Sequence, residues 1–180
     1  MLLATTKGDP LDAGKDLTIG AALALSGAHA SAAPLFGLRL VVGTPGPSGW
    51  HLALSALVGA AQQGSGGGPS LATAVGAVEQ QWLAAIGHRI GTDQLLPSRR
   101  LSAWLDAEVE GGRVTPGATA AGLAPPVFAT GLAAGLGAAL VVGPVSLPAQ
   151  AQLTYRLFAG EVGPRTRLAP RGALGVSFAF

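Results

Sequence analysis

The stretch LSAWLDAEVE, residues 101–110, decides the fold because it places charged side chains at alternate positions of an otherwise apolar segment. One set of alternate residues is apolar, Leu101, Ala103, Leu105, Ala107 and Val109, and the other is Ser102, Trp104, Asp106 and Glu108. In a helix these charges would interrupt an apolar span, whereas successive side chains of a strand point to opposite faces. The stretch therefore predicts a strand with one apolar and one polar face.

The same alternation recurs along the chain. Seven further segments show it, at residues 17–26, 35–42, 51–58, 79–89, 128–140, 151–157 and 173–180. A strand that crosses a bilayer needs about 9–11 residues and alternates apolar and polar side chains. The segments therefore predict an all-β fold over residues 15–180, an eight-stranded antiparallel up-and-down transmembrane β-barrel.

The composition excludes several other classes of protein. Charged residues make up 11% of the chain and hydrophobic residues 49%, whereas a soluble domain carries about 25% charged residues. This hydrophobicity excludes a disordered chain, and the lack of a Gly-X-Y repeat excludes collagen. The chain has no cysteine, so it has no disulfide or thiolate metal site. Its net charge is only +2 and its basic residues are scattered, which argues against a nucleic-acid partner.

Connections rich in Gly, Pro and Ser separate the segments. If both termini lie on the periplasmic side, the short inner turns are at residues 44–49, 91–98 and 143–148. The outer loops are then at residues 27–34, 64–70, 111–125 and 160–172, and they are longer on average, as such barrels require.

Two segments also fit helices, which leaves an alternative open. Ser70 as an N-cap, apolar residues at helical spacing and Gly91 at the end favour an amphipathic helix over residues 70–90. Residues 127–143, VFATGLAAGLGAALVVG, are uncharged and reach the shortest length that spans a bilayer as a helix. A small Ala/Gly-rich helical membrane protein is therefore an alternative to the barrel.

The polar faces of the predicted strands carry charges of both signs. They are Arg39, Arg89 and Arg156 against Glu79, Asp106 and Glu108. An unpaired buried charge is costly, so we expect these side chains to form a hydrogen-bonded network in the lumen. Because eight strands enclose only enough room for side chains, we expect a structural plug and no open pore. A path for protons or small ions is the alternative function of this network.

The last residues, GALGVSFAF at 172–180, end in an aromatic residue on an alternating strand. Leu174, Val176, Phe178 and Phe180 resemble the C-terminal insertion signal of bacterial outer-membrane β-barrel proteins. Over residues 15–180 the chain resembles the small eight-stranded OmpA/OmpX-type barrels. It departs from them in having few aromatic residues, 5% of the chain. It also departs from them in that Trp104 falls on the inward face of its predicted strand.

This resemblance implies a place in the bacterial outer membrane. It implies contact with outer-membrane lipid and lipopolysaccharide, and insertion by the outer-membrane barrel assembly machinery. We expect a monomer with a structural, anchoring or surface-interaction role, no enzymatic activity and no cofactor. His51 and His88 fall at strand ends, and no carboxylate stands at ligand spacing, so we expect no metal site.

Some small outer-membrane barrels are lipid A deacylases or acyltransferases with Ser and His at the outer rim, which gives an enzymatic alternative. His29, Ser31 and Glu161 fall in predicted outer loops, and a base-activated serine needs such residues close together. Arg165, Arg167 and Arg171 fall in the last predicted loop, where we expect solvated charges; contact with lipopolysaccharide phosphates is the alternative.

Residues 1–14 lack the features of a secretory signal peptide. We expect them to be an N-terminal periplasmic extension or an expression remnant. Either a signal was removed, or the barrel is the C-terminal anchor of a longer chain.

Overall fold

The computed structural model describes residues 17–27, 34–60, 78–96, 99–115, 118–119, 122–123, 125–159 and 165–180. The long strands are β1 (Thr18–Gly27), β2 (Pro34–Gly43), β3 (Gly49–Ala60), β4 (Val78–Leu96), β5 (Arg99–Thr115), β8 (Val127–Val142), β9 (Val145–Ala159) and β10 (Arg165–Ala179). Two short strands, β6 (Ala118–Thr119) and β7 (Gly122–Leu123), pair with each other. Among the residues just given, no helix is long and apolar enough to cross a membrane.

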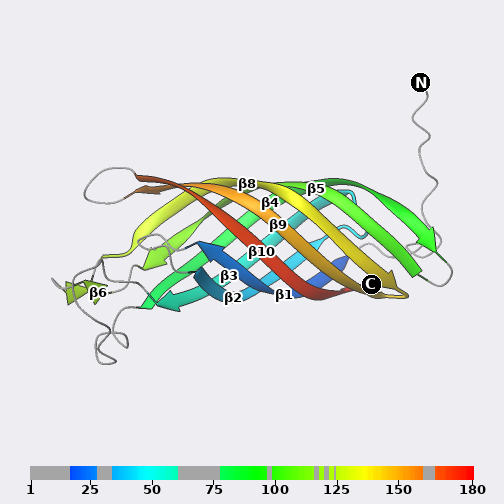
Figure 1. The fold of residues 1–180 in the computed structure, drawn as a ribbon, viewed down its shortest axis with the longest axis horizontal. Helices are drawn as coiled ribbons and strands as arrows, with labels where there is room; N and C mark the ends of the chain where they lie inside the picture. The colour runs from blue at the N-terminus through cyan, green and yellow to red at the C-terminus, as the bar shows by residue number, and fades with distance from the viewer. Residues whose placement is uncertain are drawn as a thin grey trace, which may run out of the picture.

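The eight long strands close into an antiparallel barrel in the order β1-β10-β9-β8-β5-β4-β3-β2 (Figure 1). The closing seam joins β1 to β10, from Thr18 opposite Ala179 to Ser26 opposite Arg171. Beyond the strands, the Phe180 amide donates to the Leu17 carbonyl at 2.9 Å. Closure gives every long strand two paired neighbours, which a bilayer demands because it offers backbone groups no water. The predicted barrel is confirmed, and the helical alternative is wrong.

The barrel has two ends of different kinds. The end that holds the start of β1 and the finish of β10, here called the turn end, also carries the connections at 44–48, 97–98 and 143–144. At the last of these, Gly143 and Pro144 join β8 to β9, and Gly143 has a φ of 58°. At the opposite end, called the loop end, β1, β3, β5 and β9 finish and β2, β4, β8 and β10 begin. The two sets of connections therefore fall at opposite ends as predicted, but most of the predicted borders need correction, and which end faces the periplasm stays a prediction.

Several strands are longer than the sequence predicts. Strands β4 and β5 leave only residues 97–98 between them, where the sequence predicts a turn over 91–98. Strand β10 begins at Arg165, so residues 165–172 belong to the barrel wall and not to the last loop. Residues 78–90 lie in β4, so the helix proposed for 70–90 is wrong over this part, and residues 70–77 lie outside the described residues.

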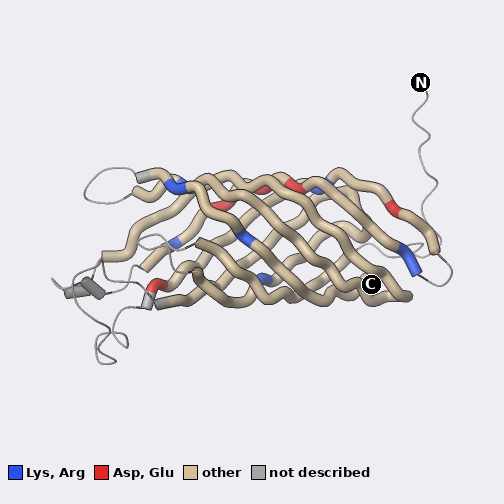
Figure 2. The backbone as a smooth tube through the Cα atoms, in the orientation of Figure 1, with Lys and Arg blue, Asp and Glu red and all other residues tan. Residues whose placement is uncertain are grey.

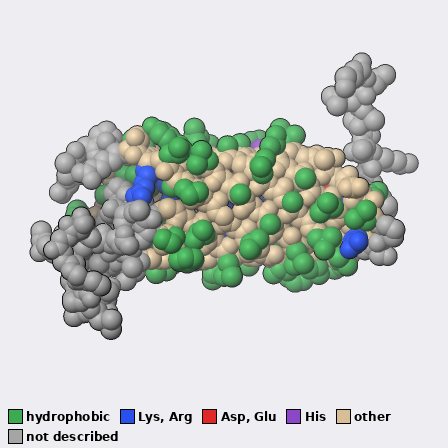
Figure 3. All heavy atoms as spheres, viewed as in Figure 1, with side chains coloured by type: hydrophobic (Ala, Val, Ile, Leu, Met, Phe, Trp, Pro, Cys, Tyr) green, Lys and Arg blue, Asp and Glu red, His purple; other side chains and the backbone are tan. Residues whose placement is uncertain are grey.

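The barrel exterior is apolar and its interior polar, as the alternation predicts. Large apolar side chains stand exposed around the wall, among them Leu23, Leu38, Leu54, Ile86, Leu105, Leu132, Leu153 and Leu174. In the face shown in Figure 3, hydrophobic side chains spread along the whole wall, and the prominent basic side chains lie near its two ends. Charged residues occur at several heights along the barrel, as Figure 2 shows, because most of them face the lumen. Such an exterior requires lipid as its solvent.

The few aromatic residues gather toward the two ends of the exterior. Phe36, Trp82, Phe128 and Tyr155 are exposed on the loop-end half, and Trp50, Phe178 and Phe180 are exposed at the turn end. Aromatic girdles at both membrane interfaces are typical of outer-membrane barrels. Trp104 and Phe158 are buried inside. The small aromatic content thus still supplies both interfaces.

The two girdles imply that the hydrocarbon midplane crosses the middle of β5. Leu105→Arg, at a side chain that is 61% exposed in mid-strand, should destabilise the barrel by about 2–4 kcal/mol. Leu101→Arg, on the same outer face near the turn end of β5, should cost at most about 1 kcal/mol. Urea unfolding from lipid vesicles measures both. Equal costs would contradict this placement of the membrane.

Candidate functional site

The charged residues predicted for the lumen all project inward. Arg39 from β2, Glu79 from β4, Asp106 and Glu108 from β5, and Arg156 from β9 are buried. Arg89 from β4 is partly buried, with 19% of its side chain exposed. These residues come from four strands, and the curvature of the closed sheet brings them together.

A chain of alternating charges crosses the lumen. Arg39 donates to Glu108 Oε1 at 2.5 Å, and Glu108 also pairs with Arg171 through its other oxygen. Arg171 donates to Glu110 Oε2 at 2.5 Å, and Glu110 pairs with Arg156 through Oε1. Each carboxylate is therefore shared by two guanidinium groups, which compensates the cost of burying these charges.

Neutral side chains form hydrogen bonds with Arg156, which is the member of this series of charges nearest the loop end. Arg156 Nη1 donates to Gln81 Oε1 at 3.0 Å and to Ser26 Oγ at 3.3 Å. Gln81 in turn donates to Glu79 at 2.7 Å. Glu79 is therefore linked to Arg156 through Gln81, and the network reaches β1 and β4.

A second centre forms around Asp106. Gln150 and Gln152 of β9 donate to its Oδ2, the latter at 3.2 Å. His51 Nε2 lies 3.1 Å from Glu108 Oε1 and 3.7 Å from Asp106 Oδ1. Arg89 Nε is 3.8 Å from Asp106 Oδ2, which is beyond hydrogen-bonding distance. Arg89 instead packs over the Trp104 ring, 5.0 Å from its centroid.

Two glycines make room for the largest inward side chains. Gly137 stands opposite Trp104 in the register of β5 and β8, and a Cβ there would overlap the indole ring. Gly87 of β4 lies against His51 and Glu108 in the same way. The small inward-facing residues therefore leave room for the large side chains of Trp, His and Arg. A barrel of this width needs such compensation because its interior is only wide enough for side chains to fill.

The loop-end part of the lumen is filled by apolar side chains. Leu83, Val114, Ala129 and Phe158 form one buried cluster, and Ala24, Leu35 and Leu57 form another. These clusters lie in the loop-end half of the barrel beside Gln81 and Glu79, since Val114 and Leu57 both stand opposite Gln81. Apolar and polar side chains together fill that half of the lumen.

His51, Asp106 and Glu108 bring three potential metal ligands within 4.8 Å of one another. Glu108 already accepts hydrogen bonds from Arg39 and Arg171, and Asp106 accepts from two glutamine amides. A metal ion would have to displace these donors and would lie beside buried guanidinium groups. The donor set therefore does not fit a metal site.

Glu110 and Arg171 are central to the network, yet the sequence analysis missed both. Glu110 lies on the same strand face as Asp106 and Glu108, but it stands at the end of the predicted strand, next to the expected loop. The sequence predicts Arg171 in the last loop with Arg165 and Arg167, and this prediction is wrong because Arg171 is buried in the lumen. Continuing the alternation of residues 173–179 back to Arg171 is the signal that could have found it.

The other predicted site residues lie on the exterior of the barrel or outside the described residues. The side chains of Leu174, Val176, Phe178 and Phe180 all lie on the exterior of the closing strand or just after it. His88 is on the exterior, edge to face with Trp50 at 4.8 Å between ring centroids. His29, Ser31 and Glu161, the candidates for catalysis, lie outside the described residues, as do residues 1–14.

A closed eight-stranded wall, an apolar exterior and a paired charged interior define a small transmembrane β-barrel of the outer-membrane type, in agreement with the predicted class and localisation. Comparison with solved structures supports this class. Neisserial surface protein A is 14% identical, with 91% of this chain and 96% of that chain covered and a TM-score of 0.50. A major outer-membrane protein from Thermus thermophilus is also 14% identical, with 93% and 100% covered and a TM-score of 0.51.

At this identity the likeness concerns the fold, and at that level the resemblance to small eight-stranded outer-membrane barrels is confirmed. A scan against protein-family models finds no match. A search of curated proteins finds no significant relative.

Arg171 joins two carboxylates, so its removal should be costly. Arg171→Met leaves Glu108 and Glu110 short of one donor each and should lower the free energy of unfolding by about 3–5 kcal/mol. Arg99→Met removes an exposed arginine and should change it by less than about 1 kcal/mol. Urea unfolding from vesicles measures both, and equal effects would show that the network contributes nothing specific.

Proposed function

We propose that the protein is an outer-membrane barrel with a structural, anchoring or surface-interaction role and a lumen that does not conduct. The observation that carries this proposal is the filling of the lumen. The charged chain from Arg39 to Arg156 spans it, and the Leu83 and Phe158 cluster adds an apolar layer on the loop side. An ion that crossed this region would have to break buried ion pairs and displace closely packed side chains.

A closed lumen predicts no channel activity. In planar bilayers the purified barrel should give no conductance steps above those of a protein-free membrane, and vesicles containing it should hold a proton gradient. A heat-unfolded sample of the same preparation controls for contaminating porins. Reproducible steps, or a proton leak that disappears in Arg156→Met, would instead support the proton or small-ion path.

The similarity of fold to Neisserial surface protein A supports the proposed surface role. The enzymatic alternative, a lipid A deacylase or acyltransferase, depends on His29, Ser31 and Glu161 and stays a prediction. Release of fatty acid from lipid A by the wild type, and its loss in Ser31→Ala, would favour that alternative over the proposed role.

We also propose that the protein is a monomer and that lipopolysaccharide contacts it at the loop end. Arg113 supports the contact, because it is exposed on β5 between Trp82 and Phe128 of the two neighbouring strands. An arginine within an aromatic girdle suits phosphate groups at the membrane interface. For assembly, we propose that the exterior residues Leu174, Val176, Phe178 and Phe180 are read by the barrel assembly machinery.

Arg113 gives this contact a direct test. Lipopolysaccharide added to vesicles should raise the urea midpoint of the wild type, and Arg113→Gln should lose at least half of that increase. Arg99→Gln, an exposed arginine at the turn end, should keep all of it. An equal response of both variants would assign the effect to the bilayer and not to Arg113.

A further inference from the structure

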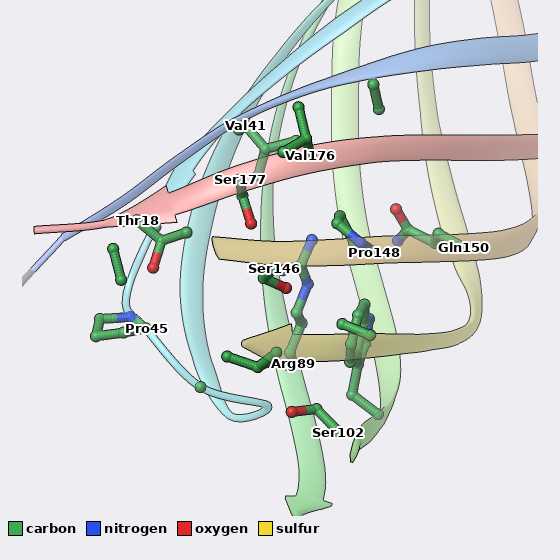
Figure 4. A pocket seen from close by; sticks show the side chains of 18 of the residues that line it. Thr18, Val41, Pro45, Arg89, Ser102, Ser146, Pro148, Gln150, Val176 and Ser177 are labelled. Atoms are coloured by element: carbon green, nitrogen blue, oxygen red, sulfur yellow. The ribbon is translucent and has the colours of Figure 1, made fainter. Parts of the chain in front are cut away.

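The lumen is not filled at the turn end. A cavity of about 90 Å³ lies there, inside the barrel, where inner faces of several strands converge. This is several times the roughly 10–15 Å³ that admits one water molecule. Figure 4 shows Arg89 extending into this space, with Ser102, Ser146 and Ser177 around it.

The lining of this cavity is basic and rich in hydrogen-bond donors. It contains three arginines, Arg39, Arg89 and Arg100, and the polar side chains of Thr18, Thr44, Ser102, Ser146, Gln150 and Ser177. Among the described residues that line it there is no aspartate or glutamate. Arginines with hydroxyl and amide donors, in a concave site with low-dielectric walls, favour an anion.

The three arginines are not equally available. Arg39 is held by Glu108 and Ser55, and Arg100 lies 3.5 Å from Asp93. Arg89 is 3.8 Å from Asp106, whose Oδ2 already accepts from Gln150 and Gln152. The Nε atoms of Arg39 and Arg89 are both buried without a hydrogen-bond partner among the described residues, but Arg39 donates through its Nη atoms to Ser55 and Glu108. Arg89 is therefore the cation whose charge and donors are least used by the network.

Trp104 fixes Arg89 in this position. The guanidinium lies over the indole ring, and the Trp104 side chain fits against Gly137 on the neighbouring strand. A cation stacked on a ring keeps the edge of its guanidinium plane, with the N–H groups, available to a ligand. The cavity thus combines a positioned cation with unoccupied space in front of it.

We propose that this turn-end vestibule binds one small inorganic oxyanion of the phosphate or sulfate type, with Arg89 as its main cationic contact. The anion enters from the turn end, because the charged chain and the apolar clusters close the other side. Ser146 and Ser177 line the same space and are placed to complete its donor set, whereas the Ser102 hydroxyl already donates to Asp93. This site is independent of the role proposed above, since a non-conducting barrel is compatible with a filled or an empty vestibule.

Trp104 also supplies a reporter for the test. The chain has three tryptophans, and Trp50 and Trp82 are exposed on the exterior. With both replaced by Phe, the emission of Trp104 should change saturably when inorganic phosphate or sulfate is added to the barrel in a phosphate-free, uncharged detergent. Sodium chloride at matched ionic strength should not reproduce the change.

Two variants and one control make the result decisive. Arg89→Met should weaken the apparent affinity at least tenfold, while Arg99→Met, which removes an exposed arginine outside the cavity, should leave it unchanged. Ser177→Leu fills the vestibule and leaves all three arginines in place, so it should also abolish binding. The mobility shift of unboiled samples on a gel verifies that each variant is folded. Absence of a saturable change in the parent, or equal binding by a folded Arg89→Met variant, would overturn the proposal.

Calorimetry with the same anions distinguishes free anions from lipid headgroups. In detergent without phospholipid, one inorganic phosphate per barrel is the expected stoichiometry. Binding seen only in vesicles of phosphatidylglycerol, and not with inorganic phosphate, would assign the response to lipid headgroups and contradict the proposed ligand.

Discussion

The hydrocarbon core of a bilayer offers no hydrogen-bond partner to a peptide group, and the rest of this structure depends on that constraint. Pairing of β1 with β10 meets it by removing both free edges of the sheet. Closure then defines an inside and an outside, and the alternation of each strand distributes its side chains between them. Lipid selects Leu, Val and aromatic residues on one face. The narrow interior selects glycine and alanine wherever Arg, Trp or His must fit, as Gly137 does for Trp104.

The interior is organised in three zones along the barrel axis. Apolar clusters and the Glu79–Gln81 pair fill the loop-end half, paired charges fill the middle, and a basic cavity remains at the turn end. The middle zone links β2, β5, β9 and β10 through Glu108 and Glu110, which lie on the same strand and bind arginines from the others. Such shared ion pairs act across the lumen, whereas backbone hydrogen bonds act only between neighbouring strands. They therefore favour one closed arrangement over sheets of other curvature.

The sequence could predict the faces of the strands but not their ends. Parity alone placed Arg39, Glu79, Asp106, Glu108 and Arg156 inside, because a shift of one residue would expose each of them to lipid. Arg171 and Glu110 were missed because a charge in a lumen and a charge in a loop look alike in composition. Partners such as Arg171 and Glu108, which are 63 positions apart, also depend on the register of every intervening strand. The cavity beside Arg89 is a product of packing volumes and leaves no motif.

Closure of the barrel between β1 and β10 is the central claim, and the cysteine-free chain allows a clean test of it. Leu23 and Leu174 stand directly opposite each other across this seam, at a separation that suits a disulfide. Leu23→Cys with Leu174→Cys should therefore crosslink on mild oxidation in vesicles, and a reducing agent should reverse the resulting gel shift. Leu23→Cys with Leu132→Cys, on β8 and separated from β1 by β10 and β9, should not crosslink within one chain. Failure of the first pair, or equal crosslinking of both, would contradict the closed eight-stranded wall.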